Sequence, residues 1–516
     1  MKFQKRFVPL LLALVLALGT LPVQAAALTR GEAVRALLSA AQDYNPGVQR
    51  SDIPAGLSIN GPFYGLSLTV NEQIAALIRE IDAHEQTPGT AEAKIKALYD
   101  CVMDVEGRER AGVAPIQKYL DAIENAKTLD ELVSVDAQMQ KELGLSMLLG
   151  FGLTTDLADS SRRIAAFSLI GAGMDKDFYV NGADAQRSAY TTYLTSLLTL
   201  LADYLSRAYV DEYFSAKAKS DVEEMIGEFI AIYKERILAQ DWMSAETKAK
   251  AVKKLDTMGV KVGYPDSWES CLDRAEIKSP AEGGSFFSNV IAIQMAMKQD
   301  VLAHQNDAPD KSEWIMTPFT VNACYNPSAN DITFPAAILQ SPLYDVNASR
   351  EENLGGIGYI IAHEITHAFD NNGAKFDENG SAADWWTAED YAAFQRKCQA
   401  VAEWYDGQEA YPGIACSGAL TISENVADLG AAKCIVAAAK KLDHPDLDKL
   451  FRAVANTWAS TTSRQMREYL AVTDVHAPDK LRCNRALQTL PEFYTTYGIR
   501  PGDGMWTAPE TRVSVW

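Results

Sequence analysis

Three residues that can do metal chemistry lie within one short stretch of the chain, residues 363–367, which read HEITH. Residues four apart lie on the same face of a helix, so His363 and His367 can bind one metal ion from adjacent turns. Glu364, the next residue along, can then reach a water molecule bound to that ion. The pattern predicts a zinc hydrolase that holds one Zn²⁺ ion per chain. Because such a pattern also arises by chance, with both histidines merely packed or solvated, the rest of the chain must decide.

Zinc in a catalytic site takes three protein ligands and keeps a fourth position for water, so the chain must supply one more ligand. The candidate is Glu424, which opens a helical pattern with an N-cap at Thr421 or Ser423. Asp428 lies one turn further along the same helix face. A ligating histidine usually donates its second ring N–H to a carboxylate, and Asp370 and Asp428 are suitable acceptors. Taken alone, Glu424 and Asp428 read equally well as a solvated helix face.

Four blocks stand in a fixed order along the chain: residues 322–325 (NACY), residues 363–373 (HEITHAFDNNG), residues 424–428 (ENVAD), and His476-Ala477-Pro478 followed by Arg482. Together they resemble the neprilysin family of zinc endopeptidases, which includes the bacterial oligopeptidase O proteins. The match is dense from about residue 204 to residue 516 and patchy upstream. The resemblance implies a mainly α-helical, two-lobed metallopeptidase with a small β-sheet, in which a thermolysin-like (gluzincin) catalytic domain faces a helical lobe.

Carried over residue by residue, the resemblance implies that Glu364 is the general base. It implies that Asp428 orients the first histidine of the motif and that Asp370 orients the second. The zinc ligands would be His363, His367 and Glu424.

Residues outside the zinc motif also acquire roles through the resemblance. Asn322 and Ala323 resemble the family's extended segment, which holds the substrate backbone like an added strand. His476 resembles the residue that stabilises the oxyanion, and Arg482 the residue that binds the carbonyl on the primed side of the scissile bond. Without the other sequence blocks, His476 and Arg482 would be interpreted as part of an ordinary loop leading into a helix, and Asn322 as a turn residue.

The pocket for the residue after the cleaved bond follows from register with the family blocks. An apolar pocket there favours cleavage on the amino side of bulky hydrophobic residues. Tyr359 departs from the aliphatic or thioether residue that is more common in the family, which bears on the size preference of the pocket. On composition alone, all of these residues would be ordinary core residues. The predicted pocket residues are Ile338, Leu343, Tyr359, Ile360 and Trp458.

The N-terminus has the pattern of an export signal. A charged start (MKFQKR) is followed by an apolar stretch from Phe7 to about Leu21 and an alanine-rich cleavage region, so residues 1–25 are interpreted as a signal peptide. An uncleaved anchor is the alternative. No later stretch offers about 18 consecutive apolar residues, so we expect no membrane span after processing. Residues 26–64 resemble a fragment of a surface-layer homology repeat, a module that tethers exported proteins to bacterial cell walls.

Composition fits a soluble, exported enzyme. The net charge of −20 argues against nucleic acid or anionic membranes as partners. Seven cysteines are spread without metal spacing, and an exported chain could pair some of them. Nothing in the sequence indicates an oligomeric state.

Hydrophobic periodicity divides the rest of the chain in two. Helical spacing dominates from about residue 70 to residue 255, with Ile74, Ile78 and Ile81 on one face, and predicts an all-helical lobe at residues 65–260. The zinc domain is predicted at residues 265–516, with strands at about 314–321 and 331–334. Members of the family are typically longer by a hundred or more residues, and their helical lobe covers the active site. The resemblance therefore supports the catalytic chemistry more strongly than it supports an enclosed active site.

Two functional hypotheses from different classes remain. The first is a secreted zinc endopeptidase that hydrolyses oligopeptides on the amino side of hydrophobic residues. The second is a non-catalytic cell-wall or peptide-binding protein on a peptidase scaffold. A degenerate scaffold would be expected to lose a ligand or the base, and because the chain carries all of the named groups, the first hypothesis is favoured. An exported solute-binding protein has only the signal pattern in its support.

Overall fold

The computed structural model describes residues 59–169, 200–268 and 270–516. The predicted signal peptide, most of the predicted surface-layer fragment and part of the predicted helical lobe therefore lie outside the described residues. The described chain is mainly helical with small sheets, which confirms the predicted fold class. No helix in these ranges is both long enough and apolar enough to span a bilayer. All seven cysteines lie within them, and each is a free thiol.

The half that contains the HEITH stretch is built around two adjacent helices, α15 (Tyr359–His367) and α17 (Ile422–Ala439). Most of α17 is buried, and the six alanines and one glycine among its 18 residues keep its packed surface narrow. A Cβ atom at Gly430 would lie 2.4 Å from Thr366 Oγ1, so glycine at this position lets the two helices approach closely. The surrounding helices are α11 (Ala216–Leu238), α12 (Ala245–Asp256), α14 (Arg350–Asn353), α16 (Ala388–Tyr405), α18 (Leu447–Thr457), α19 (Arg464–Thr473), α20 (Asp479–Leu487) and α21 (Pro491–Tyr497).

A three-stranded sheet lies beside these helices in the order β4-β6-β5. Its central strand β6 (Asp331–Pro335) is fully buried and pairs in parallel with β4 (Gly259–Gly263). The antiparallel strand β5 (Cys324–Asn326) forms an edge, with Cys324 opposite Thr333. Two-residue and three-residue strands elsewhere form the pairs β1–β9 (Ile59–Asn60 with Thr461–Thr462) and β7–β8 (Glu409–Tyr411 with Ile414–Ala415).

Of the two strands predicted from the sequence, one is present in the structure and one is not. The strand predicted at residues 331–334 is confirmed as β6. The strand predicted at residues 314–321 is wrong, because this stretch is a loop with a turn in which Thr320 N donates to Thr317 O. Pro318 explains the difference, since proline lacks the N–H that an internal strand position needs.

The other half contains a second apolar core in which Leu98, Leu205 and Ile293 are fully or almost fully buried. The prediction of an all-helical lobe is wrong here, because β2 (Leu149–Asp156) and β3 (Asp159–Leu169) form an antiparallel hairpin. The apolar residues Leu149, Phe151 and Leu153 alternate with Gly150, Gly152 and Thr154, which is the period of two typical of a strand. The helices of this half are α4 (Ala91–Met103), α5 (Val105–Ala111), α6 (Gln117–Asn125), α7 (Leu129–Leu143), α10 (Ala202–Tyr213) and α13 (Phe286–Ala303).

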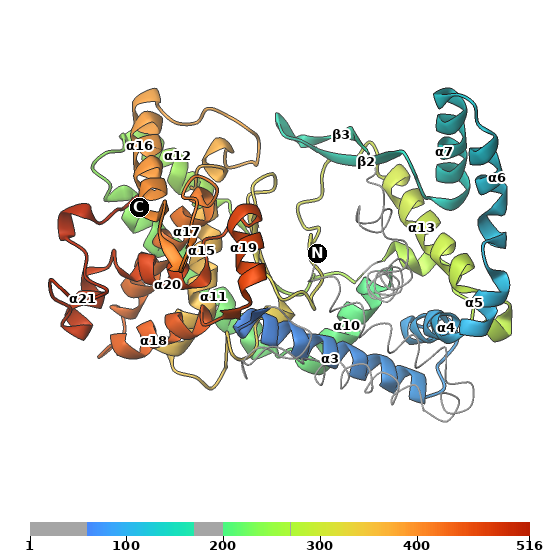
Figure 1. Cartoon of the computed structure of the whole chain (residues 1–516), viewed down its shortest axis with the longest axis horizontal. Coiled ribbons are helices and arrows are strands. Elements are labelled where there is room, and N and C mark those ends of the chain that lie inside the picture. Colours follow the sequence, from blue (N-terminus) through green and yellow to red (C-terminus); the bar gives the residue numbers. More distant parts are fainter. Residues whose placement is uncertain (1–58, 170–199, 269) are drawn as a thin grey trace.

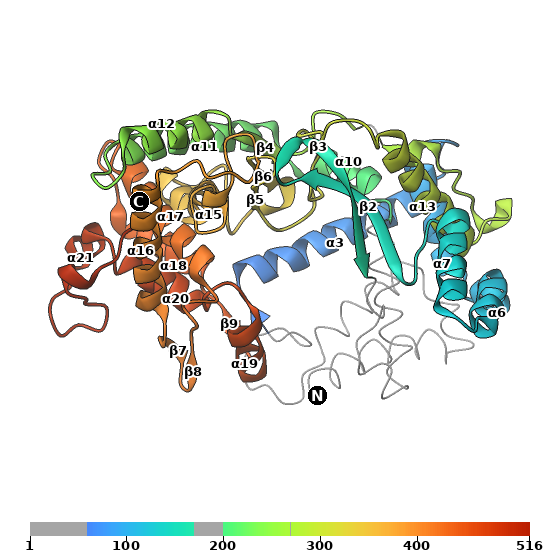
Figure 2. The ribbon, with the colours of Figure 1, turned by 90° about the horizontal axis from the view of Figure 1, so that it is seen from above.

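The long helix α3 (Pro62–Ala83) joins the two halves along one side, as Figures 1 and 2 show. Its residues Leu66 and Val70 belong to the core of the zinc half, whereas Ile81 belongs to the second core. The predicted boundary near residue 260 does not separate the two halves in space, because helices on each side of it in the sequence pack in the opposite half. Helices α11 and α12 precede that boundary and pack in the zinc half, whereas α13 follows it and packs on α4 and α7. The boundary itself stays a prediction.

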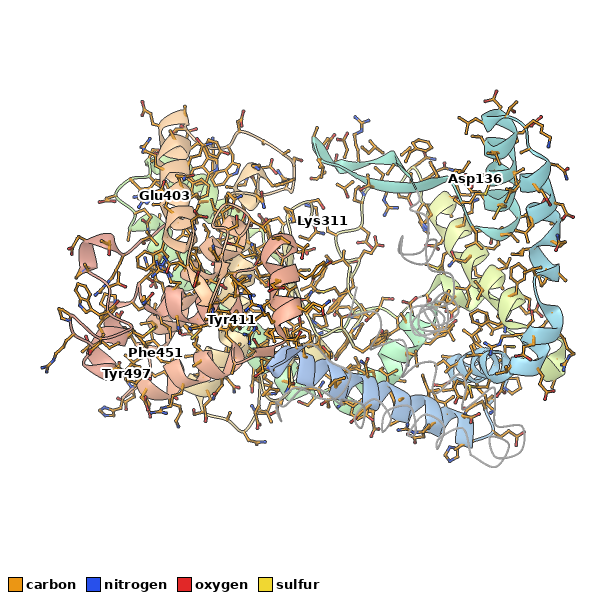
Figure 3. The ribbon with its side chains drawn as sticks, in the orientation of Figure 1. Asp136, Lys311, Glu403, Tyr411, Phe451 and Tyr497 are labelled. Carbon is orange, nitrogen blue, oxygen red and sulfur yellow. The ribbon has the colours of Figure 1, made fainter. Side chains whose placement is uncertain are left out.

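The β2–β3 hairpin joins the halves at a second place. Leu157 O, at the hairpin turn, accepts a hydrogen bond of 2.6 Å from the backbone N–H of Ala382. Ser160 Oγ donates to Asn379 O at 2.6 Å, and Lys311 Nζ donates to the same oxygen at 2.8 Å from the loop between the halves (Figure 3). The segment at residues 379–382 is therefore a fixed contact point between the two halves.

Candidate metal centre

Close packing determines where α15 starts and which way it faces. A single π-helical turn at Leu354–Gly358 precedes it, and this turn is rich in glycine. A Cβ atom at Gly355 would lie 2.5 Å from Leu450 O, so the turn can approach α18 only without a side chain. Burial of the apolar residues of α15 then fixes the helix so that its two histidines point to the same side, toward α17.

Three potential ligand atoms converge between α15 and α17. The Nε2 atoms of His363 and His367 are 2.9 Å apart, and they lie 3.1 Å and 3.4 Å from Glu424 Oε2. A tetrahedral zinc ion with ligand bonds of about 2.0–2.1 Å would separate its ligands by about 3.3–3.4 Å. The triangle therefore has nearly the size that one zinc ion requires. Among the described residues, these three side chains have their ligand atoms close enough together to hold one metal ion.

The opposite ring nitrogens show which atoms of the histidines are free to bind a metal. His363 Nδ1 lies 2.8 Å from Asp428 Oδ1, and His367 Nδ1 lies 2.6 Å from Asp370 Oδ2. A carboxylate accepts a hydrogen bond, so each Nδ1 carries the proton and each Nε2 presents a lone pair. Glu424 Oε2 is buried and faces the Nε2 atoms of both histidines. Three electron-rich atoms facing one another fit a zinc cation, so the predicted zinc site at His363, His367 and Glu424 is confirmed.

Electrostatics point to the same need for positive charge. Burial would raise the pKa of Glu424, but the three histidines around it hold that pKa well below its usual range. Burial would lower the pKa of His367, but hydrogen bonds to Asp370 and Glu424 hold it well above its usual range. Both shifts favour the ionised carboxylate together with a cation beside it.

Asp428 connects the metal centre to Arg482. It is fully buried, and its two oxygens accept hydrogen bonds from Arg482 Nε at 2.8 Å and Nη2 at 2.9 Å. The guanidinium also lies over the ring of Trp458, with its carbon 3.9 Å from the ring centroid. Burial would raise the pKa of Asp428, but Arg482 and His363 lower it overall. The Nη1 group of Arg482 makes no hydrogen bond among the described residues and is the donor left for a ligand.

A cavity of about 380 Å³ opens directly onto the metal centre. Glu364 lines it together with both histidines, so its carboxylate faces the space above the ligand triangle. Asn322 and Ala323 form another part of the wall and lead into the edge strand β5. The cavity therefore brings the predicted base, the zinc ligands and the predicted substrate-binding segment to one place.

His476 stands in the wall of the same cavity. Its Nε2 atom lies 3.1 Å from Glu424 Oε2, and its Nδ1 atom lies 2.8 Å from Asp474 Oδ1. Burial would lower the pKa of His476, but hydrogen bonds to Asp474 and Glu424 raise it to about 9. Asp474 was not predicted, although an acid two residues before the histidine was a readable signal.

Only some of the predicted pocket residues line the cavity. Ile360 and Trp458 line the cavity. Ile338, Leu343 and Tyr359 are at most 1% exposed and lie in the core behind its wall. They can shape the cavity only through their neighbours; Tyr359, for example, donates a hydrogen bond to Asp428 O.

Phe63 is a cavity residue that the sequence did not indicate. It comes from the start of α3, and its ring stacks on Trp458 with centroids 5.7 Å apart and planes inclined by 24°. It also borders a second cavity of about 390 Å³, which shares Asn322, His476 and Arg482 with the first. Its contribution depends on a contact between residues almost four hundred positions apart, which no local pattern reveals.

A helix that carries two histidines one turn apart, joined by a glutamate from a second helix and with a glutamate facing the same cavity, defines a zinc metallopeptidase site. Models of peptidase family M13 match residues 46–204 and 199–265, and residues 322–513. The chain belongs to peptidase family M13, which confirms the predicted family.

Individual relatives agree with this assignment. The chain is 39% identical over 308 residues to a neutral endopeptidase of Lactobacillus helveticus, covering 60% of this chain and 47% of the relative. It is 34% identical over 328 residues to human endothelin-converting enzyme-like 1, covering 60% and 42%. The chain thus spans about half the length of the curated relatives that it matches.

Solved structures share the fold. The zinc metalloprotease Zmp1 of Mycobacterium tuberculosis, in complex with an inhibitor, superposes with a TM-score of 0.78 at 24% identity, covering 91% of this chain and 95% of that one. PepO from Lactobacillus rhamnosis HN001 superposes with a TM-score of 0.76 at 23% identity, covering 90% and 97%. Both likenesses extend over the two halves of the molecule.

Proposed function

We propose that this protein is an exported zinc endopeptidase that hydrolyses oligopeptides on the amino side of hydrophobic residues. The observation that carries the proposal is the triangle formed by His363 Nε2, His367 Nε2 and Glu424 Oε2, with the Glu364 carboxylate facing the same cavity. A binding protein on a peptidase scaffold would need the ligands but not a free carboxylate beside them.

The chemistry is divided among named side chains. Zinc bound to the triangle would supply a Lewis acid and lower the pKa of a bound water toward 7. Glu364 takes the proton of the attacking water and then passes it to the leaving amine. His476 holds a hydrogen-bond donor near the developing oxyanion, an interaction typically worth about 3 kcal/mol in such sites. Asp474 fixes the ring of His476, and Asp370 and Asp428 fix the rings of the two ligands.

The substrate backbone is held from two sides in this proposal. Residues before the edge strand β5, Asn322 and Ala323, offer backbone and amide groups to an extended peptide. Arg482 offers Nη1 to a carbonyl beyond the scissile bond while Asp428 keeps its other donors occupied. An extended peptide bound between them would pass over Glu364.

Zinc content is the first test of the proposed function. We expect the purified protein to hold one zinc ion per chain and to cleave a peptide such as a decapeptide with a central Leu or Phe. Removal of zinc by a chelator should abolish cleavage, and stoichiometric zinc should restore it. Atomic absorption together with mass spectrometry of the products measures both. A zinc-loaded protein that leaves every member of a diverse peptide library intact would contradict the proposal.

Phe63→Ala tests the proposed pocket. Loss of an aromatic wall residue should lower kcat/KM about 10-fold for substrates with Phe after the cleaved bond, because roughly 1–3 kcal/mol of apolar contact is lost. Substrates with Ala at that position should change less than threefold. The matched control is Tyr497→Ala, since Tyr497 lies at the outer corner of the zinc half, outside both cavities (Figure 3). An equal loss on both substrates would place Phe63 outside the specificity pocket.

Selection of short substrates is part of the same proposal. The halves are joined through α3 and through the β2–β3 hairpin, which supports restricted access for bulky chains. A digestion that compares a decapeptide with a folded and a denatured protein tests it directly. Export is supported by the signal pattern at residues 1–25, and cell-wall association by residues 26–64. N-terminal sequencing of protein recovered from medium and cell-wall fractions would identify the processed end.

A further inference from the structure

Lys254 is a buried lysine whose role the proposed mechanism does not explain. It lies near the end of α12, is 1% exposed, and forms no ion pair within the described residues. Its ammonium donates instead to three backbone carbonyls, those of Ala368 at 2.9 Å, Gly373 at 2.8 Å and Phe376 at 2.7 Å. An ammonium has three donors, so each of its hydrogens has an acceptor.

All three acceptors belong to one loop, residues 368–376, that begins where α15 ends. Ala368 immediately follows the ligand His367, and Gly373 begins a short 3₁₀ turn (Gly373–Lys375). Carbonyls at a helix C-terminus lack partners within the helix, and a cation there is stabilised by them and by the helix dipole. The lysine therefore fixes the path of the chain as it leaves the zinc-binding helix.

The same loop carries Asp370, which holds the second histidine ligand. Asp370 Oδ1 accepts hydrogen bonds from the backbone N–H groups of Asn372 at 2.6 Å and Gly373 at 2.7 Å. Its Oδ2 atom lies 2.6 Å from His367 Nδ1. Gly373 is thus shared: its N–H binds Asp370 and its C=O binds Lys254. A Cβ atom at Gly373 would lie 1.8 Å from His367 O, so this junction admits only glycine.

We propose that Lys254 is a positioning residue for the zinc centre, which acts by fixing loop 368–376 so that Asp370 is held against His367 Nδ1. The proposal deepens the proposed peptidase function and rests on it for its biological meaning. Its structural basis is the chain of contacts from Lys254 through Gly373 and Asp370 to the ligand. Burial lowers the pKa of Lys254 to about 7, although the nearby carboxylates of Asp370, Asp377 and Glu378 act to raise it.

The test compares two lysines. Lys254→Met keeps the length of the side chain and removes its donors. The matched control is Lys433→Met, because Lys433 is a lysine on α17 that donates to Trp516 O at 3.1 Å and does not touch loop 368–376. Zinc affinity is measured by competition with a chelator of known affinity, without substrate. We expect Lys254→Met to weaken zinc binding about 10-fold, as loss of groups behind a ligand typically does, and Lys433→Met to change it less than twofold.

A double-mutant cycle with Asp370→Ala separates positioning from general destabilisation. If Lys254 acts through Asp370, Lys254→Met should weaken zinc binding no further once Asp370→Ala is present. Unchanged zinc affinity in Lys254→Met, or a full additional loss in the double variant, would overturn the proposal. If the methionine variant does not fold, Lys254→Gln, which keeps two donors, should weaken zinc binding by a smaller factor. Because affinity is measured without substrate, an inactive wild-type protein would refute the proposed function and leave this result standing.

Discussion

Glu364→Gln is expected to lower kcat by about 10²–10⁴-fold, the usual contribution of a general acid–base group. Glutamine keeps the size of the side chain and can still hydrogen-bond a water molecule, but it cannot accept a proton. Because Glu364 faces the cavity and is not one of the three converging ligands, zinc affinity should stay within about twofold. Steady-state kinetics and zinc analysis on the same preparation measure the two effects.

A matched control for this substitution is Glu378→Gln. Glu378 lies just after loop 368–376, but its carboxylate is paired with Lys253 and does not line the cavity, so activity should remain near that of the wild type. Wild-type kcat in Glu364→Gln would refute the assignment of the general base. Loss of zinc together with activity would show instead that Glu364 supports the metal.

Asp428→Ala should damage zinc binding and stability at once. It removes the acceptor of His363 Nδ1, and loss of such an acceptor typically weakens metal affinity about 10–100-fold. It also leaves Arg482 buried without its carboxylate partner, a change that usually lowers the free energy of unfolding by about 3–5 kcal/mol. Urea denaturation of the metal-free protein isolates the second effect from the first.

Asp370→Ala provides the comparison. It removes the acceptor of His367 Nδ1 and should weaken zinc binding by a similar factor, but it leaves no buried arginine without a partner. The metal-free protein should lose only about 1–3 kcal/mol, because the backbone N–H groups of Asn372 and Gly373 lose the Asp370 carboxylate to which they donate hydrogen bonds. Equal stability losses in the two variants would contradict the role given to the ion pair between Asp428 and Arg482.

The sequence predicted the parts of the site that follow a local period. Two histidines four residues apart on an apolar helix place their rings together whatever the rest of the fold does. Glu424 was assigned through a family resemblance, because nothing local shows that residue 424 meets residue 363. The structure supplies the reason: Gly430 and the alanines of α17 let the two helices approach closely.

The parts that sequence reasoning missed depend on exposure or on long-range contacts. Register with a family identified Ile338, Leu343 and Tyr359 as neighbours of the pocket, but register does not say whether a side chain reaches the surface. Phe63 enters the site only because α3 crosses from one half of the molecule to the other. The β2–β3 hairpin was overlooked because its alternation stands within a long stretch of helical periodicity.

The placement of α11 and α12 has a consequence for how the protein is made. These helices precede α15 and α17 by more than a hundred residues, yet their apolar faces, including Met225, Ile226 and Phe229, pack in the core with them (Figure 2). During synthesis those faces lack their partners on α15 and α17 until α17 has emerged from the ribosome, and exposed apolar surface of this kind attracts chaperones and favours aggregation. Fragments that stop before residue 439 should therefore be insoluble, and the zinc half should not be obtainable as a continuous C-terminal piece.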